Sequence, residues 1–304
     1  MFDRFIEAFT GQLLGKLLKN EPLAKHTTLR VGGPAKVFVQ PLDKDAFVST
    51  IKLVREFNLP YKVLGKGSNL LASDDVFEGV IIQTDKSINY TIIDDTLVTV
   101  GAGVSDVKLA RDMAKVGLAG LEFISGIPGT IGGAIFMNAG AYNKEIKDVI
   151  KKVLILDNFN ELRWLNQEEL EFSYRKSIFQ KNPDWVIIEA VLELELGDKE
   201  TILATIKSRK EKRMIAQPLE MPSAGSTFRN PDGHAAWKLV ADSGLRGFSV
   251  GGAKVSTKHT NFVINSGDAT AMDIYQVILH VQDEIYRQHQ LKMHREVELF
   301  NWSE

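Results

Sequence analysis

Ser226 lies in the stretch PSAGSTFRNP, residues 222–231, where a proline and a glycine precede it and Arg229 and Asn230 follow it. A hydroxyl on such a constrained turn can belong to a phosphate-binding loop, an acylating nucleophile, a proton donor or an ordinary turn. The local AGSTF is not the G-x-S-x-G motif of nucleophilic serines, and acyl transfer also needs a histidine base. The residues around Ser226 therefore predict a rigidly held hydroxyl and leave its chemistry open.

Two glycine-rich stretches have the composition of phosphate-binding loops, LGKGSN at residues 64–69 and SGIPGTIGG at residues 125–133. Glycine allows positive φ angles and close approach, so successive backbone N–H groups can converge on an anion. Neither stretch is a Walker loop, which ends in Gly-Lys-Ser/Thr, and neither fits the GxGxxG of dinucleotide-binding folds. An ordinary turn explains either stretch alone. The pair makes a large phosphate-bearing cofactor an equal alternative.

Three further groups of charged residues could take part in chemistry. Tyr174 and Arg175 lie in the polar segment SYRKS, and Glu296 and Glu298 are spaced by two in REVELF, which predicts one face of a strand. A solvated arginine and a solvated strand edge are the alternatives for these two segments. The basic run KSRKEKR, residues 207–213, favours a wet helix face over a diphosphate clamp.

The sequence argues against a metal site. It contains no cysteine, and its histidines show no ligand spacing such as H-E-x-x-H. These histidines are His26, His234, His259, His280, His289 and His294. We therefore predict no metal, no disulfide and no cysteine nucleophile.

These residues need a frame of helices and strands to hold them. Apolar spacing predicts helices over 43–60, 105–117, 199–214, 234–248 and 270–290, with Ser105 as one N-cap and Thr270 and Asp273 as a capping pair. Strands are predicted at 34–41, 61–64, 79–84, 90–94, 97–103, 149–158, 185–196 and 295–301. Because strands and helices mix without a regular βαβ period, the pattern favours an α+β fold.

The composition sets outer limits on function. The 304 residues can form two or three domains, and a net charge of −2 gives no general attraction to nucleic acid or anionic membranes. The longest apolar runs are strand-sized, so we predict no membrane insertion. The N-terminal stretch 1–23 is amphipathic, without a small-residue cleavage site, and predicts a docking helix instead of a signal peptide. We expect a cytoplasmic protein.

Five motifs together resemble one enzyme family. LGKGSNLL, GIPGTIGGAIFMNAGAY, SYRKSIF, AGSTFRNP and REVELF occur in the order found in the UDP-N-acetylenolpyruvoylglucosamine reductase (MurB) family. The resemblance runs from about residue 20 to residue 301, and its first two motifs also look like the FAD-binding half of the vanillyl-alcohol-oxidase superfamily. It implies two α+β FAD-binding subdomains, at 1–85 and 86–214, followed by a smaller α+β substrate-binding domain at 215–304.

The resemblance implies a noncovalent FAD held by both glycine-rich stretches. The residues that match the family's cofactor pattern are Leu64, Gly65, Lys66, Gly67, Ser68, Asn69, Gly126, Ile127, Pro128, Gly129, Thr130, Gly132, Gly133, Ala134, Asn138 and Gly140. Tyr174, Arg213, Arg229, Asn230 and His259 match positions expected at a UDP-sugar substrate. No histidine lies in either stretch and there is no cysteine, so covalent attachment of the flavin is disfavoured.

The family's activity is the second committed step of bacterial peptidoglycan precursor synthesis, which serves cell-wall formation, cell shape and division. The resemblance implies that NADPH reduces FAD, that the flavin N5 delivers hydride to the enolpyruvyl ether, and that UDP-N-acetylmuramate results. Ser226 matches the family's proton donor, and Arg175 and Glu296 match the residues that stabilise the enolate-like intermediate. A preorganised cation near that charge needs no reorganisation when the charge appears.

One departure from the family's longer class concerns a tyrosine-bearing loop that closes over the substrate. SYRKSIFQKNPDWVIIEAVLEL runs directly into a strand, so the chain resembles the shorter, type II subclass. Two alternatives remain: another noncovalent FAD oxidoreductase of the same superfamily, or a catalytically silent nucleotide-sugar-binding protein. We expect no obligatory protein partner and either a monomer or a weak dimer.

Overall fold

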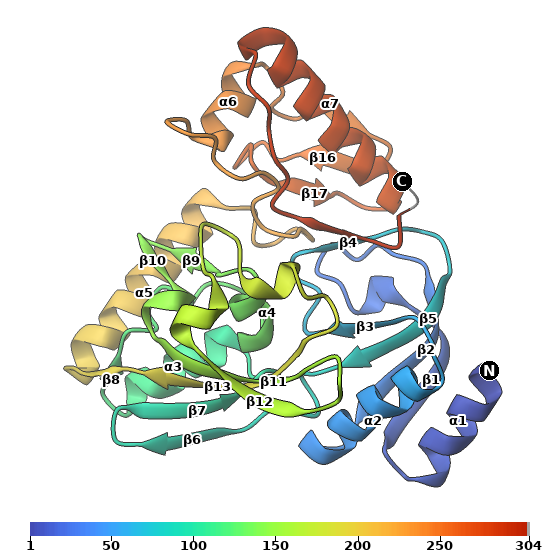
Figure 1. Cartoon of the computed structure of the whole chain (residues 1–304). Helices are drawn as coiled ribbons and strands as arrows, with labels where there is room; N and C mark the ends of the chain where they lie inside the picture. Colours follow the sequence, from blue (N-terminus) through green and yellow to red (C-terminus); the bar gives the residue numbers. More distant parts are fainter. Residues whose placement is uncertain (303–304) are drawn as a thin grey trace. The chain divides into compact units, whose positions relative to one another are not determined.

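A computed structural model describes residues 1–302 and divides the chain into two compact units. Unit 1 comprises residues 1–19, 37–66 and 79–211, and unit 2 comprises residues 20–36, 67–78 and the chain from Lys212 onward. Figure 1 shows the course of the chain through both units. The units divide the chain differently from the three predicted domains, whose boundaries stay a prediction.

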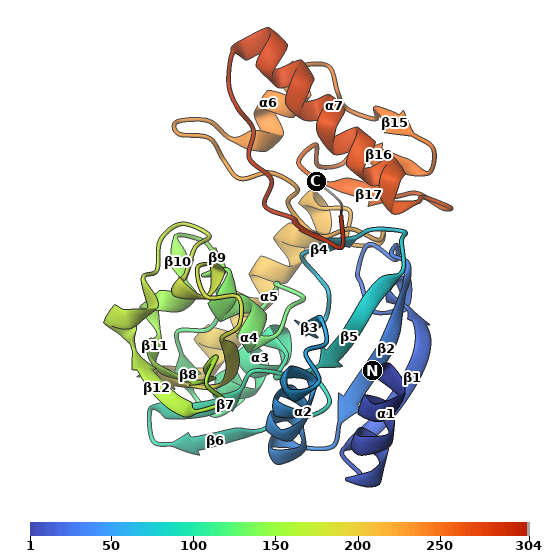
Figure 2. The ribbon, with the colours of Figure 1, turned by 45° about the vertical axis from the view of Figure 1, so that its right-hand side comes forward.

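The first sheet has the strand order β1-β2-β5-β3. Its strands are β1 (Gly15–Pro22), β2 (Pro34–Pro41), β3 (Tyr61–Leu64) and β5 (Phe77–Gln83), and β3 runs parallel to β5. Helices α1 (Phe2–Gly11) and α2 (Lys44–Glu56) contact one another and lie side by side in both ribbon views (Figures 1 and 2). Phe5, Phe9 and Phe47 are fully buried in the core that these helices share with the sheet.

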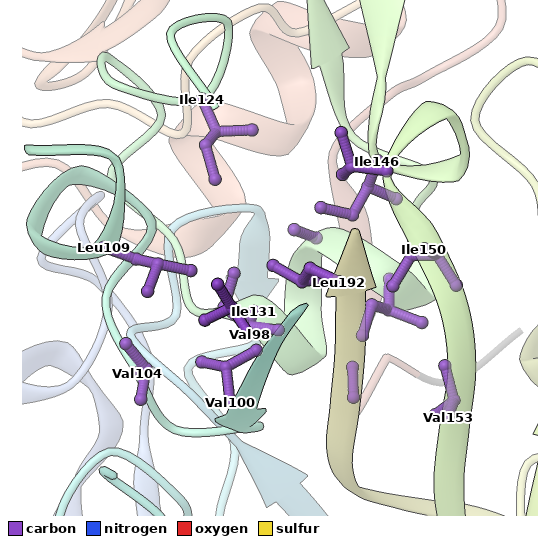
Figure 3. Close-up of a cluster of buried hydrophobic side chains, with 14 of the residues drawn as sticks. Val98, Val100, Val104, Leu109, Ile124, Ile131, Ile146, Ile150, Val153 and Leu192 are labelled. Carbon is purple, nitrogen blue, oxygen red and sulfur yellow. The ribbon is translucent and has the colours of Figure 1, made fainter. Parts of the chain in front are cut away.

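The second sheet of unit 1 is antiparallel and has the order β12-β11-β13-β7-β6. Its strands are β6 (Thr91–Asp94), β7 (Leu97–Gly101), β11 (Ile150–Leu156), β12 (Leu162–Asn166) and β13 (Val186–Glu193). Helices α3 (Asp106–Lys115) and α4 (Ile131–Phe136) share its apolar core, drawn in Figure 3. Val98, Val100 and Ile131 are completely buried there, so the second glycine-rich stretch is anchored in this core by its own Ile131 side chain.

Unit 2 is built around a three-stranded antiparallel sheet and one long helix. The strands are β15 (Ser249–Val250), β16 (Ala253–Val255) and β17 (Val263–Asn265), and α7 (Ala271–His289) contacts all three. Helix α6 (Ala236–Asp242) packs against α7, and β4 (Leu70–Ala72) pairs in parallel with β18 (Glu298–Phe300). Ile274, Val277 and Ile278 of α7 are buried in this core.

Helix α5 (Lys199–Ala216) and several short elements complete the described chain. The short elements are the 3-10 turns Leu23–Lys25, Ile146–Asp148, Gln167–Leu170 and Ile178–Gln180, and the paired strands β8 (Leu118–Ala119) with β14 (Glu195–Leu196) and β9 (Gly140–Ala141) with β10 (Lys144–Glu145). No helix of the described residues is long and apolar enough to cross a membrane.

The α+β fold, the five helices predicted after residue 42 and most strands are confirmed, although α6 covers only part of the predicted 234–248. Three local expectations are wrong. The N-terminal helix ends at Gly11, because Leu13 takes φ +53° and the chain then joins the first sheet as β1. Ser105 occupies the N-cap position of α3, but its side chain makes no capping hydrogen bond. Glu296 precedes β18 instead of sharing a strand face with Glu298.

The predicted capping pair of α7 is confirmed. Thr270 Oγ1 accepts the N–H of Asp273 at 3.0 Å, and the Asp273 carboxylate accepts the N–H of Thr270 at 3.0 Å. The Asp74 carboxylate also accepts the N–H groups of Ala271 and Met272, at 3.0 and 3.2 Å. The first backbone N–H groups of a helix have no partner within the helix. In α7 they are satisfied by the N-cap residue Thr270 and by Asp74, which is distant in the sequence.

Replacing Thr270 by Ala should lower the free energy of unfolding by about 1 kcal/mol, because the Asp273 N–H loses its acceptor. Chemical denaturation followed by circular dichroism measures the difference. Thr270→Ser keeps the hydroxyl and is the matched control, so a loss of equal size in both variants would contradict the capping role.

Candidate active site

In unit 1 the two glycine-rich stretches meet. A Cβ placed on Gly65 would lie 2.5 Å from Thr130 Oγ1, which is closer than real side chains approach, so only glycine fits there. Thr130 Oγ1 in turn accepts the N–H of Gly133 at 3.5 Å and caps α4. The structure thus brings together two predicted cofactor stretches that lie far apart in the sequence.

Lys66 supplies the positive charge beside this contact. Its Nζ donates to Ser105 Oγ at 2.7 Å, and Ser105 forms an isolated antiparallel bridge with Thr130. The Ser105 hydroxyl therefore tethers Lys66 instead of capping α3. The side chain that the sequence assigned to a helix end belongs to the candidate cofactor site.

Asp106, the residue after Ser105, is completely buried, and its backbone N–H donates to the carbonyl of Gly129 in the second stretch at 3.3 Å. Neither of its carboxyl oxygens has a hydrogen-bond partner within residues 1–302. Burial raises the pKa of Asp106 to about 8, and the nearby Lys66 only partly opposes this shift. Asp106 is therefore protonated at neutral pH and leaves the charge of Lys66 uncompensated.

This arrangement fits the diphosphate of a dinucleotide. It offers closely packed glycine backbone, an ammonium group held by a hydroxyl, and a neighbouring acid kept neutral by burial. Residues 64–66 belong to unit 1, whereas Gly67, Ser68 and Asn69 belong to unit 2. There, the Gly67 carbonyl accepts the N–H of Thr28 at 3.2 Å, and Asn69 contacts the segment of Glu296.

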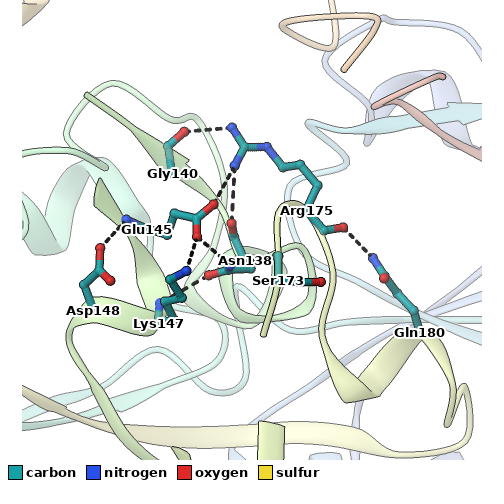
Figure 4. A network of polar contacts seen from close by, with 8 residues as sticks. All are labelled: Asn138, Gly140, Glu145, Lys147, Asp148, Ser173, Arg175 and Gln180. Carbon is teal, nitrogen blue, oxygen red and sulfur yellow. Dashed lines mark hydrogen bonds and ion pairs between the residues drawn. The ribbon is translucent and has the colours of Figure 1, made fainter. Parts of the chain in front are cut away.

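Arg175 is held by backbone carbonyls and does not extend into solvent (Figure 4). Its guanidinium donates to the carbonyl oxygens of Gly140 at 3.0 Å and Asn138 at 3.4 Å, lies 3.6 Å from the Glu145 carboxylate, and has only 14% of its side chain exposed. The ring of the exposed Tyr174 lies 4.8 Å from the guanidinium carbon. Four predicted site residues, Asn138, Gly140, Tyr174 and Arg175, are therefore neighbours in unit 1.

Asn138 holds the loop that carries Arg175. It is fully buried at φ +43°, and its Nδ2 donates to Glu145 Oε2 at 3.0 Å and to the Ser173 carbonyl at 2.9 Å. Its Oδ1 accepts the N–H of Lys147 at 3.3 Å. Glu145 was absent from the predicted site, although its position close behind the motif MNAGAY was a signal that could have pointed to it.

In unit 2 the structure brings Ser226 and Glu296 onto neighbouring segments. The Thr227 carbonyl accepts the N–H of Glu296 at 2.8 Å, and Phe228 forms an antiparallel bridge with Arg295. Asn69 Nδ2 donates to the Glu296 carbonyl at 3.0 Å. The side chains of Ser226 and Glu296 are both half-buried. A hydroxyl and a carboxyl are therefore attached to backbone segments that pair with one another.

The remaining predicted substrate residues of unit 2 have separate surroundings. The backbone N–H of Arg229 donates to the His294 carbonyl at 2.9 Å. The buried Nε of the Arg229 side chain has no hydrogen-bond partner among the described residues. Burial lowers the pKa of His259, which is therefore neutral at pH 7. Asn230 Oδ1 accepts the N–H of Ala236 at 2.9 Å, at the start of α6. Arg213 Nε donates to Gln217 at 2.8 Å.

Comparison with known proteins identifies the class and then the family. A family of FAD binding domains matches residues 35–166, so the chain is an FAD-binding flavoprotein. The C-terminal domain of UDP-N-acetylenolpyruvoylglucosamine reductase matches residues 217–300.

Full-length relatives carry the same name. Reductases of this name from Halalkalibacterium halodurans and Bacillus subtilis are 44% and 42% identical to the chain. Each match covers 98% of this chain and 98% of the relative. The crystal structure of the MurB reductase from Thermus caldophilus superposes with a TM-score of 0.79 at 32% identity, covering 94% of this chain and 98% of that one. The chain belongs to the UDP-N-acetylenolpyruvoylglucosamine reductase family and is an FAD-dependent oxidoreductase. The predicted family and fold are confirmed.

Asp106→Asn should stabilise the flavin-free protein at neutral and mildly alkaline pH. The folded pKa of about 8 exceeds the ordinary value of 3.8, so the native state holds a proton that the unfolded chain releases between those values. Native stability therefore falls as pH rises through this window, by up to about 1.4 kcal/mol per pH unit. The amide of the variant does not titrate and carries no such cost, so its advantage should grow from about pH 4 to pH 8.

Thermal denaturation across this pH range measures the advantage. Asp112→Asn, on the partly exposed side of the same helix, is the control and should follow the wild-type profile. An Asp106→Asn advantage that is the same at every pH would show that Asp106 does not release a proton on unfolding.

Proposed function

We propose that this chain reduces the enolpyruvyl ether of UDP-N-acetylglucosamine to UDP-N-acetylmuramate, with FAD as the cofactor and NADPH as the hydride donor. The observation that carries the proposal is the backbone pairing of the Ser226 turn with the Glu296 segment, in a chain of this family. It supports a proton donor and a carboxyl at one reaction centre.

The cofactor would be held by Gly65, Lys66 and the glycine-rich stretch that ends in Ala134. When bound and reduced by NADPH, FAD would supply the hydride that adds to the vinyl carbon of the enolpyruvyl substrate. The tethered ammonium of Lys66 supports the binding of a diphosphate here, because the adjacent Asp106 is neutral at pH 7 and does not repel it. Gly67, Ser68 and Asn69 complete the proposed cofactor loop.

Ser226 would donate the proton that completes the reduction. A serine hydroxyl is a weak acid, so it can serve only when it is held against a strongly basic carbanion. The paired backbone that follows Ser226 supports such placement. Glu296, on the partner segment, would assist the same intermediate as a carboxylic acid or through a water.

Arg175 would stabilise the negative charge that develops on the substrate carboxylate. The planar guanidinium suits a carboxylate, and its anchoring to the Gly140 and Asn138 carbonyls fixes its position in advance. Stabilisation of this kind needs no rearrangement when the charge forms, which is why a held cation is more effective than a mobile one.

The UDP-sugar would be recognised by Tyr174, Arg213, Arg229, Asn230 and His259. His259 would act as a neutral hydrogen-bonding group because burial lowers its pKa. Only residues 181–185 separate the turn after Arg175 from β13, which supports the type II subclass and a grip on UDP without the tyrosine loop. We also propose a cytoplasmic enzyme of cell-wall synthesis, acting as a monomer or weak dimer.

Ser226→Ala should leave reduction of the flavin by NADPH within about twofold of the wild type and slow its anaerobic reoxidation by the enolpyruvyl substrate about 10²- to 10⁴-fold. The reason is that only the second half-reaction consumes the serine proton. Stopped-flow absorbance of the flavin follows each half-reaction separately.

Ser223→Ala, in the same turn, is the matched control and should leave both rates unchanged. Reoxidation by the substrate at the wild-type rate in Ser226→Ala would refute the proton-donor role. A yellow wild-type protein that NADPH reduces, but that the enolpyruvyl substrate does not reoxidise, would refute the proposed function itself.

A further inference from the structure

Asn261 is a buried amide that binds the backbone immediately after Ser226. Its Oδ1 accepts the N–H of Phe228 at 3.0 Å, and its Nδ2 donates to the Phe228 carbonyl at 2.9 Å. Its own carbonyl accepts the N–H of Thr227 at 2.8 Å. Only 4% of Asn261 is exposed, and Phe228 is 1% exposed, so water does not substitute for these bonds.

The bonds to Asn261 continue to Glu296. Thr227, held on one side by Asn261, accepts the N–H of Glu296 at 2.8 Å through its carbonyl, and its Oγ1 accepts the N–H of Val263 at 3.1 Å. The two residues after Ser226 are thus fixed between β17 and the segment of Glu296. On the side of β17, the side chain of Asn261 makes the bonds to Phe228.

The chain before Ser226 is held at Ser223, which forms an antiparallel bridge with Ile264 of β17. Gly225 has φ +77°, and a Cβ placed on it would have nothing within 4 Å, so the turn there is open on its glycine side. The restraints nearest to the Ser226 hydroxyl are consequently those on Thr227 and Phe228, the residues that follow it. A displacement of a reacting group by about 1 Å can cost about a hundredfold in rate.

We propose that Asn261 is a positioning residue that holds the Ser226 hydroxyl in a fixed relation to Glu296. This inference rests on the proposed function, because it needs Ser226 to be the proton donor. Asn261 touches neither the substrate nor the cofactor in this role. It acts through the backbone of Thr227 and Phe228.

Asparagine suits this position because its amide pairs with a backbone N–H and a backbone carbonyl at once. Alanine would leave both buried groups of Phe228 without these partners, and the loss would lower the melting temperature of the protein. Loss of stability alone therefore cannot distinguish positioning from simple packing. A readout specific to Ser226 is required.

Asn265 provides the matched control at the end of β17. It is equally buried, at 5% exposure, and its Nδ2 donates to the Leu29 carbonyl at 3.1 Å while its Oδ1 accepts the N–H of Gly267 at 3.0 Å. These partners lie outside residues 226–228, so Asn265→Ala removes buried hydrogen bonds of the same type without loosening the turn.

The test compares the two flavin half-reactions in the full-length holoenzyme of Asn261→Ala and Asn265→Ala. We expect Asn261→Ala to slow reoxidation by the enolpyruvyl substrate about a hundredfold and to leave reduction by NADPH within about twofold. Asn265→Ala should lower the melting temperature to a similar extent and change neither rate. Equal slowing of both half-reactions in Asn261→Ala, or the same reoxidation defect in Asn265→Ala, would overturn the proposal.

A double variant tests whether Asn261 acts through Ser226. If it does, adding Asn261→Ala to Ser226→Ala should slow reoxidation no further, because the group that it positions is already missing. Multiplying effects would overturn the proposal. If Ser226→Ala alone slows both half-reactions alike or neither, the proton-donor role of Ser226 fails, and if the wild-type flavin is not reoxidised by the substrate, the proposed function fails, so these failures can be told apart from that of Asn261.

Asn261→Asp keeps the test possible if the alanine variant does not fold. The introduced carboxyl still accepts the Phe228 N–H, but it can donate to the Phe228 carbonyl only while it is protonated. His259 Nδ1, which accepts the Asn261 N–H at 3.3 Å, is the titratable group that contacts this position. Reoxidation relative to the wild type should therefore recover as pH falls, and a pH-independent ratio would contradict the positioning role.

Discussion

The constraint on which the candidate site depends is the need to satisfy buried backbone groups outside regular helices and strands. An unpaired buried N–H or carbonyl costs free energy comparable to a lost hydrogen bond, so irregular segments must find side-chain partners. Three asparagines meet this need. Asn138 binds the loop of Arg175, Asn261 binds the turn of Ser226, and Asn69 binds the segment of Glu296. Each predicted catalytic residue therefore lies on backbone that an amide side chain holds.

The charged groups of unit 1 are also held by neutral partners. Lys66 is tethered by a neutral hydroxyl, and the adjacent Asp106 is kept protonated by burial at neutral pH. Arg175 lies on two carbonyl oxygens, with the Glu145 carboxylate at 3.6 Å. Neutral acceptors orient a cation without cancelling its charge, whereas an ionised acid in direct contact would compete with an anionic ligand. In this way the positive charge of Lys66 stays available in unit 1, whereas Arg175 shares its charge with the Glu145 carboxylate.

The sequence predicted best what local chemistry decides. The capping pair of α7 and the course of α2 follow from residues within one or two turns, and both are confirmed. The bond from Lys66 to Ser105 was out of reach, because Lys66 lies 39 positions away and its ammonium outcompeted the helix end for the hydroxyl. The N-terminal helix was predicted too long because an amphipathic pattern does not reveal that residues after Gly11 will pair with a strand.

The site followed the same division. Motifs predicted Ser226, Arg175 and Glu296 as site residues, and these assignments stay predictions. Glu145 and Asn261 were not predicted, because their contacts are made across the fold. A glycine-rich stretch or a charged side chain is conspicuous in a sequence, but an asparagine that binds backbone is not. Asparagine nevertheless suits this position best, because its neutral amide can pair with a backbone N–H and a backbone carbonyl at once. Aspartate could accept the Phe228 N–H but would repel its carbonyl when ionised, and it would place a negative charge near a carbanion. A neutral amide that both donates and accepts would position the proposed proton donor, Ser226, without opposing the negative charge of the proposed intermediate.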